Sequence, residues 1–371
     1  MMKKILVFGM TENPGGVESV IMNYYRHIDR NKIQFDFLCN SYEKIAYEDE
    51  ILALGGKTFH FPARSKDYFG YRRSLNEFFK NHAKEYHAIW VNVCSLANID
   101  YLVLAKKYGI PKRIIHSHNS QNMDGKLRGI LHQRNKKRIV RYATDFWACS
   151  EDAAKWFYEE PICSEAVLIH NAVDVEKFEF DSVARDKIRK QLGWEDCFIL
   201  GNIGRLHFQK NQSFAIDVFA ELLKQEPNAR LVFVGQGEDK VKLEEKIAEL
   251  GLQDKVCLAG RQSNIAEWLS AFDLFLFPSL FEGLSVVALE AQANGIPTVA
   301  SKGVIPEEVV LNDNFKLYDL ADGAKAWSTY AADELETRER EEFKQIKYNF
   351  MMAGYDIEHE KKRFERLIAE N

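Results

Sequence analysis

The sequence is poor in the residues that mark fibrous and disordered proteins. Its 371 residues include only 8 prolines and 21 glycines, while 46% are hydrophobic and 28% are charged. These proportions exclude collagen-like, proline-rich and intrinsically disordered chains. The chain is longer than a typical domain of roughly 150 residues and can bury a sizeable core, so we expect two globular domains.

Long hydrophobic runs are also absent. No run approaches the roughly 18 apolar residues of a transmembrane helix. The apolar start of the chain, MMKKILVFGM, meets Thr11 and Glu12 before it reaches the length of a signal-peptide core, so it predicts a first strand. We therefore expect a cytoplasmic protein.

The six cysteines are scattered, and none lies in a C-x-x-C pair or near histidines at the spacing of zinc ligands. This pattern predicts reduced thiols and no metal site. The formal net charge of −5 argues against a dedicated nucleic-acid-binding protein, because such a protein usually carries a strongly basic domain.

Short apolar runs alternate with amphipathic stretches, including a helix expected at about 17–30. This alternation predicts βαβ units with buried parallel strands. The runs lie at 3–9, 34–39, 87–93, 113–118 and 144–150 in a first series, and at 197–204, 229–235, 256–260, 272–279 and 296–301 in a second.

The two series predict an α/β fold with two doubly wound, Rossmann-like domains. The charged segment between them carries no strand pattern and suits a linker with a leading helix. We expect an N-terminal domain at 1–180, a C-terminal domain at 181–352, and a terminal helix at 353–371 that packs back on one of them, with the N-terminal domain as first choice. Ligands of such sheets bind outside the carboxyl ends of the strands, which places the site in a cleft.

The most informative stretch is FPSLFEGLSVVALEAQANGIPTVAS at 277–301. It predicts a strand, a loop that holds Glu282, and a helix that carries Glu290 and ends near Gly295. Glu290 follows Glu282 by about 12 Å along a helix axis. Carboxylates accept hydrogen bonds from sugar and ribose hydroxyls. The alternative is that Glu282 only complements the helix dipole and Glu290 is a solvated surface residue.

The start of this predicted helix offers an anion site. The backbone N–H groups of Gly283, Leu284 and Ser285 would lie in the first turn, where they lack intrahelical acceptors. The favourable end of the helix dipole adds to their attraction for a phosphate.

The stretch 277–301 resembles the E-x7-E signature of the family 4 GT-B glycosyltransferases, a retaining group that includes capsule and exopolysaccharide enzymes. Other motifs extend the resemblance over most of the chain, although Ala172 stands where the family usually has glycine. The similar stretches are PGGVE at 14–18, HSHN at 116–119, HNAVD at 170–174 and GNIGRLHFQKN at 201–211. The resemblance implies the GT-B fold, in which two Rossmann-like domains face each other across a cleft.

The resemblance also implies roles for individual residues. It places His118, Glu282, Arg205 and Lys210 in catalysis, and Gly15, Gly16, Gly283, Leu284, Ser285 and Glu290 in donor binding. No cofactor is implied, because the nucleotide diphosphate sugar is the donor substrate. Metal-dependent sugar transferases of the other main fold use a D-x-D motif, which this sequence lacks, so we expect a metal-independent enzyme.

Arg205 and Lys210 also have a physical argument of their own. Both follow the first strand of the second series, and a diphosphate leaving group needs fixed positive charge as its bond breaks. Arginine holds phosphate oxygens with two parallel N–H bonds, while lysine acts as a point charge. The alternative is that both are ordinary surface charges.

Two sites are expected in the N-terminal domain. Gly15 and Gly16 follow the first strand and allow close approach of the backbone to donor phosphates or acceptor. A dinucleotide site is a weak alternative, because neither this loop nor VGQG at 234–237 has the G-x-G-x-x-G spacing. His118 ends a strand, and the family's equivalent histidine lies near the transferred sugar. His116 projects to the same side, so spacing alone does not separate the two.

The segment KLRGILHQRNKKRIVR at 126–141 is strongly basic, with seven Lys or Arg and no acidic residue. A basic amphipathic helix there predicts docking to an anionic membrane surface, at the inner face of the membrane. The alternative is a solvated helix face. Docking suits a lipid-linked acceptor, which the resemblance to polysaccharide enzymes implies.

The predicted function is transfer of a sugar from a nucleotide diphosphate sugar to a hydroxyl of a glycan or lipid-linked saccharide, with retention, in bacterial-type polysaccharide biosynthesis. UDP is the first choice of nucleotide. An inactive nucleotide-sugar or glycan-binding protein stays open as an alternative, as does a nucleotide-sugar epimerase or a phosphorylase-like enzyme.

Overall fold

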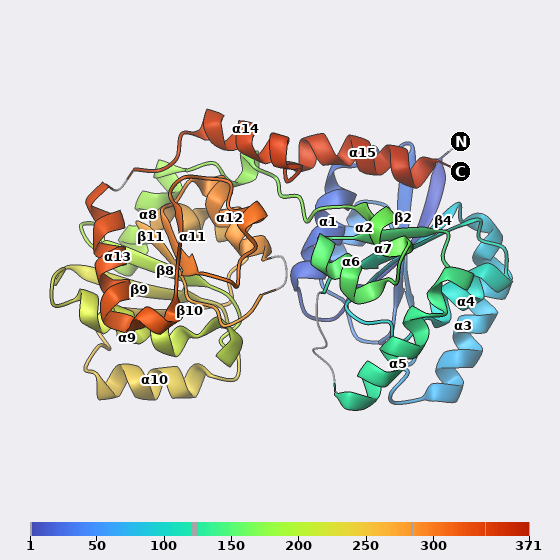
Figure 1. The fold of residues 1–371 in the computed structure, drawn as a ribbon, viewed down its shortest axis with the longest axis horizontal. Coiled ribbons are helices and arrows are strands. Elements are labelled where there is room, and N and C mark those ends of the chain that lie inside the picture. Colours follow the sequence, from blue (N-terminus) through green and yellow to red (C-terminus); the bar gives the residue numbers. More distant parts are fainter. Residues whose placement is uncertain (1, 120–124, 283–284, 338, 371) are drawn as a thin grey trace. The chain divides into compact units, whose positions relative to one another are not determined.

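A computed structural model describes residues 2–119, 125–282, 285–337 and 339–370. The chain divides into two compact units (Figure 1). The first comprises Met1–Ala172 together with Ile357–Asn371, and the second comprises Val173–Asp356.

The first unit is built on a seven-stranded parallel sheet. The strand order is β3-β2-β1-β4-β5-β6-β7, so the winding direction changes between β1 and β4. The strands are β1 (Lys3–Phe8), β2 (Ile33–Cys39), β3 (Thr58–His60), β4 (Ala88–Val93), β5 (Lys112–Ser117), β6 (Asp145–Ala148) and β7 (Val167–Leu168). In an open parallel sheet, ligands bind at the carboxyl ends of the strands beside such a change.

Eight helices cover this sheet in the described part of the unit. They are α1 (Gly16–His27), α2 (Glu48–Ala53), α3 (Tyr68–His82), α4 (Asp100–Lys107), α5 (Lys126–Lys136), α6 (Glu151–Phe157), α7 (Ile162–Glu165) and α15 (Ile357–Ala369). The terminal helix α15 packs on α1 (Figure 1), where the ring of Phe364 stacks on Tyr24 with centroids 4.4 Å apart. The last helix of the chain thus completes the core of the first unit.

The second unit is built on a six-stranded parallel sheet with the order β10-β9-β8-β11-β12-β13. Its strands are β8 (Phe198–Ile203), β9 (Ala229–Val234), β10 (Val256–Gly260), β11 (Leu274–Phe277), β12 (Thr298–Ser301) and β13 (Phe315–Tyr318). Its helices are α8 (Ser182–Leu192), α9 (Gln212–Leu222), α10 (Lys240–Glu249), α11 (Ile265–Ala271), α12 (Val286–Asn294), α13 (Gly323–Thr337) and α14 (Phe343–Ala353).

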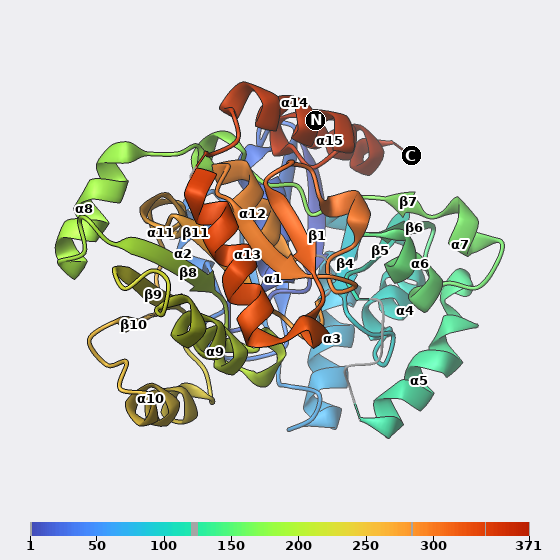
Figure 2. The same ribbon diagram turned by 60° about the vertical axis from the view of Figure 1, so that its left-hand side comes forward.

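The second sheet has a core on each face. On one face α9 and α13 lie side by side (Figure 2), and Phe219 and Trp327 are fully buried beneath them. On the other face the core includes Ile188, Leu289 and Phe350 from α8, α12 and α14. The prediction of two doubly wound, Rossmann-like domains is confirmed.

Some predicted elements have different bounds. The helix expected at 17–30 spans Gly16–His27, and the short edge strands β3, β7 and β13 were not predicted. The basic helix expected at 126–141 was wrong in length, since α5 ends at Lys136 and Ile139–Arg141 forms a 3-10 turn. Ile139 is buried in the core, and a β-branched pair disfavours continuation of the helix.

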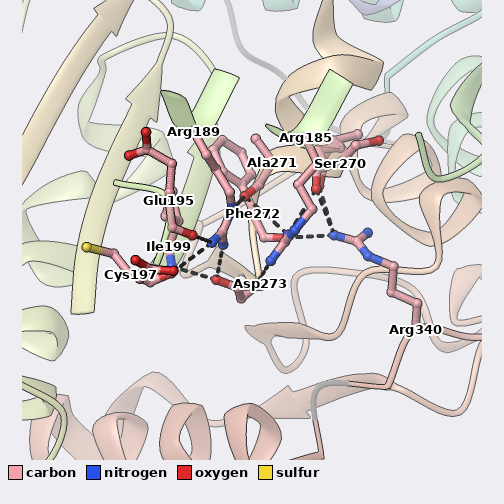
Figure 3. A network of polar contacts seen from close by, with 12 residues as sticks. Arg185, Arg189, Glu195, Cys197, Ile199, Ser270, Ala271, Phe272, Asp273 and Arg340 are labelled. Atoms are coloured by element: carbon pink, nitrogen blue, oxygen red, sulfur yellow. Dashed lines mark hydrogen bonds and ion pairs between the residues drawn. The ribbon is translucent and has the colours of Figure 1, made fainter. Parts of the chain in front are cut away.

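A cluster of buried charges holds the second unit together. Arg185 and Arg189 of α8 both form ion pairs with Asp273, which also accepts a hydrogen bond from the Ile199 backbone N–H at 2.8 Å. Arg340, from the connection between α13 and α14, joins them (Figure 3).

The guanidinium groups converge on carbonyl groups at the end of α11, where the helix dipole favours positive charge. Arg340 donates to the carbonyl of Phe272 at 2.6 Å, and burial lowers the pKa of Arg340 to about 9. Arg185 donates to the same carbonyl at 3.0 Å. These contacts fasten α8 and the α13–α14 connection to one helix end.

Candidate active site

Two loops at the carboxyl ends of neighbouring strands form the candidate site of the second unit. One loop follows β8 and carries Lys210, and the other follows β11 and carries Glu282; the two strands pair in parallel. Lys210 Nζ lies 2.6 Å from Glu282 Oε1, and only 15% and 6% of the two side chains are exposed. The structure therefore brings these two predicted residues into one ion pair.

Gln209 joins the same two loops. Its carbonyl accepts a hydrogen bond from the Leu280 N–H at 2.8 Å, and its Nε2 donates to the Phe281 carbonyl at 2.9 Å. Asn211 has a φ of 54°, a left-handed conformation that asparagine tolerates better than most residues, and it turns the chain into α9. These contacts fix the loop that carries the ion pair.

The loop after β9 lies very close to the loop after β8. A Cβ atom at Gly235 would lie 1.9 Å from the Gly204 carbonyl oxygen, and one at Gly237 would lie 2.2 Å from the Leu206 carbonyl oxygen. Both glycines belong to the VGQG stretch. Glycine is required there because any side chain would separate this loop from the loop after β8.

Arg205 has a partner that sequence reasoning missed. Its Nε lies 3.0 Å from Glu238 Oε2, and His207 Nε2 lies 3.4 Å from the other oxygen of the same carboxylate. The Arg205 side chain is 68% exposed. Arg205 thus follows β8 as predicted, but the structure pairs it with Glu238 and not with the residues around Glu282. Nothing in the local spacing signals this pair, because Glu238 follows a different strand.

The helix after β11 begins later than predicted. Helix α12 starts at Val286, with Ser285 at its N-cap, so the expectation that Ser285 lies in its first turn was wrong. Serine is a favoured N-cap residue, although the Ser285 side chain makes no capping hydrogen bond here. Gly283 and Leu284 lie outside the described residues. Gly295 ends the helix in a left-handed conformation, as predicted.

Glu290 lies on α12 and is not the solvated surface residue of the alternative interpretation. The residue is partly buried, and burial raises its pKa to about 7. The positive charge of Lys177 acts in the opposite direction and lowers the pKa of Glu290 by less than burial raises it. Within the described residues the carboxyl group has no hydrogen-bond partner. It is therefore available to accept hydrogen bonds from a ligand.

In the first unit, the glycine loop is closed by Glu18. The two carboxylate oxygens of Glu18 accept hydrogen bonds from the Gly15 N–H at 3.1 Å and the Thr11 hydroxyl at 2.6 Å. Gly15 caps α1, and a Cβ atom at Gly16 would meet nothing within 4 Å. The backbone at Gly16 is thus open to an approaching group. Sequence reasoning missed Glu18, although its position three residues after Gly15 is that of a capping box.

The structure separates the two histidines that sequence spacing left unresolved. His116 is fully buried in β5, with its ring stacked on Trp90. His118 follows the strand, and its Nε2 lies 2.9 Å from Asn92 Oδ1. Burial lowers the pKa of His118 to about 3, so its ring is neutral near pH 7. Asn92 is a further residue that no motif indicated.

The basic segment presents apolar side chains to solvent. Leu127 and Ile130 are 72% and 66% exposed on α5, while Lys136 donates to the Lys155 carbonyl at 2.7 Å. Across the described ranges, no helix combines the length and apolar character needed to cross a membrane. Over the same ranges, no three His, Cys, Asp or Glu side chains gather as metal ligands.

The structure accommodates alanine at position 172, where the family usually has glycine. Ala172 is fully buried and adopts no positive φ, and its carbonyl accepts a hydrogen bond from Asn23 Nδ2 at 3.2 Å. The turn at this position does not need glycine.

Comparison with known proteins identifies the family. Residues 14–177 match the family described as Glycosyltransferase Family 4, and residues 184–350 match Glycosyl transferases group 1. EpsF of Bacillus subtilis strain 168, which is named as a glycosyltransferase, is 30% identical over 366 residues, or 96% of this chain and 94% of that protein. The Escherichia coli protein named UDP-Gal:alpha-D-GlcNAc-diphosphoundecaprenol alpha-1,3-galactosyltransferase is 32% identical over 155 residues, or 41% of this chain and 40% of that one.

Solved structures share the fold of this chain. HepE (Alr3699) of Anabaena, in a crystal structure with UDP and glucose, matches with a TM-score of 0.78 and 20% identity, over 99% of each chain. At this identity the likeness establishes the GT-B fold alone. Together with the full-length similarity to EpsF, the two domain matches show that this chain belongs to the family 4 glycosyltransferases of GT-B fold.

Proposed function

We propose that the enzyme transfers a sugar from a nucleotide diphosphate sugar, with UDP as the nucleotide, to a hydroxyl of a glycan or lipid-linked saccharide in polysaccharide biosynthesis. The observation that carries the proposal is the partly buried Glu290, whose carboxyl group has no hydrogen-bond partner in the described residues. It lies on α12, the helix that follows the loop of the Lys210–Glu282 pair. The names of two relatives support the choice of ligands, since HepE is crystallised with UDP and glucose and the E. coli enzyme is named for UDP-Gal and a diphosphoundecaprenol acceptor.

The proposed donor site distributes its contacts over the second unit. Glu290 accepts hydrogen bonds from the ribose hydroxyls, and Glu282 binds the donor sugar or stabilises its charge. Lys210 and Arg205 bind the diphosphate, and the backbone N–H groups of Gly283, Leu284 and Ser285 bind it as well. Arg205 exchanges Glu238 for phosphate oxygens, which is favourable because its present ion pair is exposed and weak.

The proposed reaction retains the anomeric configuration. An acceptor hydroxyl attacks the anomeric carbon on the face of the leaving group, the bond from that carbon to the phosphate oxygen breaks, and a phosphate oxygen takes the hydroxyl proton. Positive charge fixed on Lys210 and Arg205 stabilises the leaving diphosphate without a metal ion. From the first unit, His118 contacts the transferred sugar or acceptor, and Gly15 and Gly16 let the backbone approach the donor phosphates or acceptor.

Nucleotide binding tests this proposal first. We expect the wild type to bind UDP more tightly than GDP, ADP or NAD in calorimetric titrations with EDTA present. Glu290→Gln should weaken UDP binding by about 10- to 100-fold, the range for hydrogen bonds to a charged group. Because the pKa of Glu290 is about 7 and its ionised form is the better acceptor, UDP affinity should rise between pH 6 and pH 8 in the wild type.

The control is Glu249→Gln, which neutralises an exposed carboxylate on α10 and should leave UDP affinity unchanged. The rise of affinity with pH should disappear in Glu290→Gln. Binding of NAD alone, or of no nucleotide, would overturn the donor-site assignment. Product analysis by NMR then decides retention, since an inverted anomeric configuration contradicts the proposed reaction.

We also propose that α5 docks to the inner face of an anionic membrane. The support is the exposure of Leu127 and Ile130 on a helix without acidic residues. Lys126→Gln with Lys137→Gln should weaken binding to anionic vesicles by about 30-fold, because each lysine near such a surface contributes roughly 1 kcal/mol. Co-sedimentation at low and high salt measures the effect.

The matched control is Lys240→Gln with Lys242→Gln, which removes two exposed charges from α10 in the other unit. It should sediment with anionic vesicles as the wild type does. Equal sedimentation of both double variants would contradict docking through α5, and so would equal binding of the wild type to neutral and anionic vesicles.

A further inference from the structure

Asn92 occupies the junction of three strands in the first unit. It lies in β4, is 2% exposed, and is paired in register with His116 of β5. Its Nδ2 donates to the Phe8 carbonyl at the end of β1, at 3.3 Å. Its Oδ1 lies 2.9 Å from His118 Nε2, just beyond the end of β5. The amide group thus connects the carboxyl ends of β1 and β5.

This arrangement determines which nitrogen of His118 carries hydrogen. The Phe8 carbonyl only accepts hydrogen bonds, so the NH2 end of the Asn92 amide must face it. The oxygen of the amide therefore faces His118, and an oxygen acceptor requires a hydrogen on Nε2. Since the ring of His118 is neutral near pH 7, its Nδ1 is then a free acceptor.

His118 Nδ1 is buried and has no partner within the described residues. A buried acceptor without a partner is costly, so such an atom points to a ligand group that donates to it. The titratable group beside the ring is His116, with ring centroids 4.1 Å apart, and burial lowers its pKa well below the usual range. Both rings are therefore neutral near pH 7, and no charge competes with a hydroxyl donor.

The backbone of β1 holds Asn92 from the other side. Gly9 has a φ of +138°, and a Cβ atom there would lie 2.7 Å from both the Cβ and the carbonyl oxygen of Asn92. Only glycine permits this close approach. The backbone N–H of His118 also donates to the Val93 carbonyl at 3.2 Å, so the residues that carry both side chains are fixed.

We propose that Asn92 is a positioning residue that keeps His118 in the tautomer with hydrogen on Nε2, so that Nδ1 accepts a hydrogen bond from a hydroxyl group of the sugar substrate. This inference rests on the proposed function, because it takes the substrate to be a sugar that contacts His118. It requires a substrate with a free hydroxyl at the position that faces Nδ1.

The tautomer is measured without substrate. In protein labelled with 15N on histidine, long-range 1H–15N spectra at pH 7 should show hydrogen on Nε2 of His118 in the wild type, with the resonances assigned from His118→Gln. Asn92→Ala should lose this preference, whereas Asn92→Asp should keep it because the carboxylate restores an acceptor. Hydrogen on Nδ1 in the wild type, or an unchanged tautomer in Asn92→Ala, would overturn the proposal.

Kinetics test the consequence. Asn92→Ala should lower kcat/KM for sugar transfer by about 3- to 10-fold, the range for one neutral hydrogen bond. Asn92→Asp places a negative charge beside the ring and raises the pKa of His118. As the pH is lowered, the activity of this variant should therefore be lost at a higher pH than that of the wild type, and it should recover at alkaline pH. A merely structural role would not move the pH profile in this way.

Asn76→Ala is the control, because Asn76 accepts a hydrogen bond from the Tyr108 hydroxyl at 2.9 Å on the surface of the same unit. It should leave the tautomer and the pH profile unchanged. Sugar transfer with wild-type kinetics in both Asn92 variants would overturn the inference and leave the proposed function intact. If the wild type transfers sugar from none of the nucleotide sugars, the proposed function is wrong instead. The tautomer measurement then decides the role of Asn92 by itself.

Discussion

Lys210→Ala is expected to lower kcat by about 100- to 1000-fold, the range seen when a preorganised group that stabilises transition-state charge is removed. Lys210 is mostly buried at the carboxyl end of β8, where its charge is weakly screened by solvent. Its present partner, Glu282, would remain as a buried carboxylate without a counter-charge. The variant therefore loses the stabilisation of the leaving diphosphate and gains a group that repels it.

Steady-state rates with the nucleotide sugar found by titration measure this loss. Lys246→Ala is the matched control, since Lys246 forms an ion pair of the same length, 2.6 Å, with Asp217 between α9 and α10. It should leave kcat unchanged. A loss below about 10-fold in folded Lys210→Ala, or an equal loss in the control, would refute the role at the phosphate.

Asp273→Asn is expected to lower the free energy of unfolding of the second unit by about 3–5 kcal/mol, the range for breaking a buried ion pair by removal of one partner. Asp273 is the acidic partner of Arg185 and Arg189 (Figure 3). Only 10% of its side chain is exposed. The substitution leaves two arginines without a counter-charge beside the buried Arg340. It also turns an amide NH2 group toward one of the N–H groups that donate hydrogen bonds to Asp273.

Urea denaturation of the full chain, followed by Trp fluorescence and far-UV circular dichroism, measures the change. Glu221→Gln is the control in the same unit, because it breaks the exposed pair with Lys224 on α9 and should change stability by less than about 1 kcal/mol. The two units can unfold in separate transitions, and only that of the second unit should move. A midpoint in Asp273→Asn equal to that of the control would show that the network does not stabilise the unit.

Elements whose pattern is local were predictable. The apolar runs that became β1, β4, β8 and β11 are buried by neighbours on both sheet faces, so they are continuous in the sequence. The E-x7-E and K-N motifs could also be found, because each lies within one segment that runs from a strand into the next helix. The edge strands β3, β7 and β13 were missed, since they are short and partly exposed; β7 has only two residues.

Other features depend on segments that are distant in the chain. Asn92 lies inside an apolar run with no motif, and it meets His118 only because β4 and β5 are neighbours in the sheet. The partner of Arg205 is Glu238, which follows the next strand, β9. The start of α12 at Val286, with Ser285 at the N-cap, was likewise read only from the structure.

The sequence by itself determined the fold class, the family and the positions of Lys210, Glu282 and Glu290 along the chain. Periodicity and motif spacing are sufficient for these, because they reflect the backbone geometry of single elements. Only the tertiary structure decided that Lys210 pairs with Glu282, that Glu290 is partly buried, and which of two histidines lies in the core. Burial and hydrogen-bond partners depend on the order of strands in each sheet, and that order brings together residues whose separation in the sequence carries no signal.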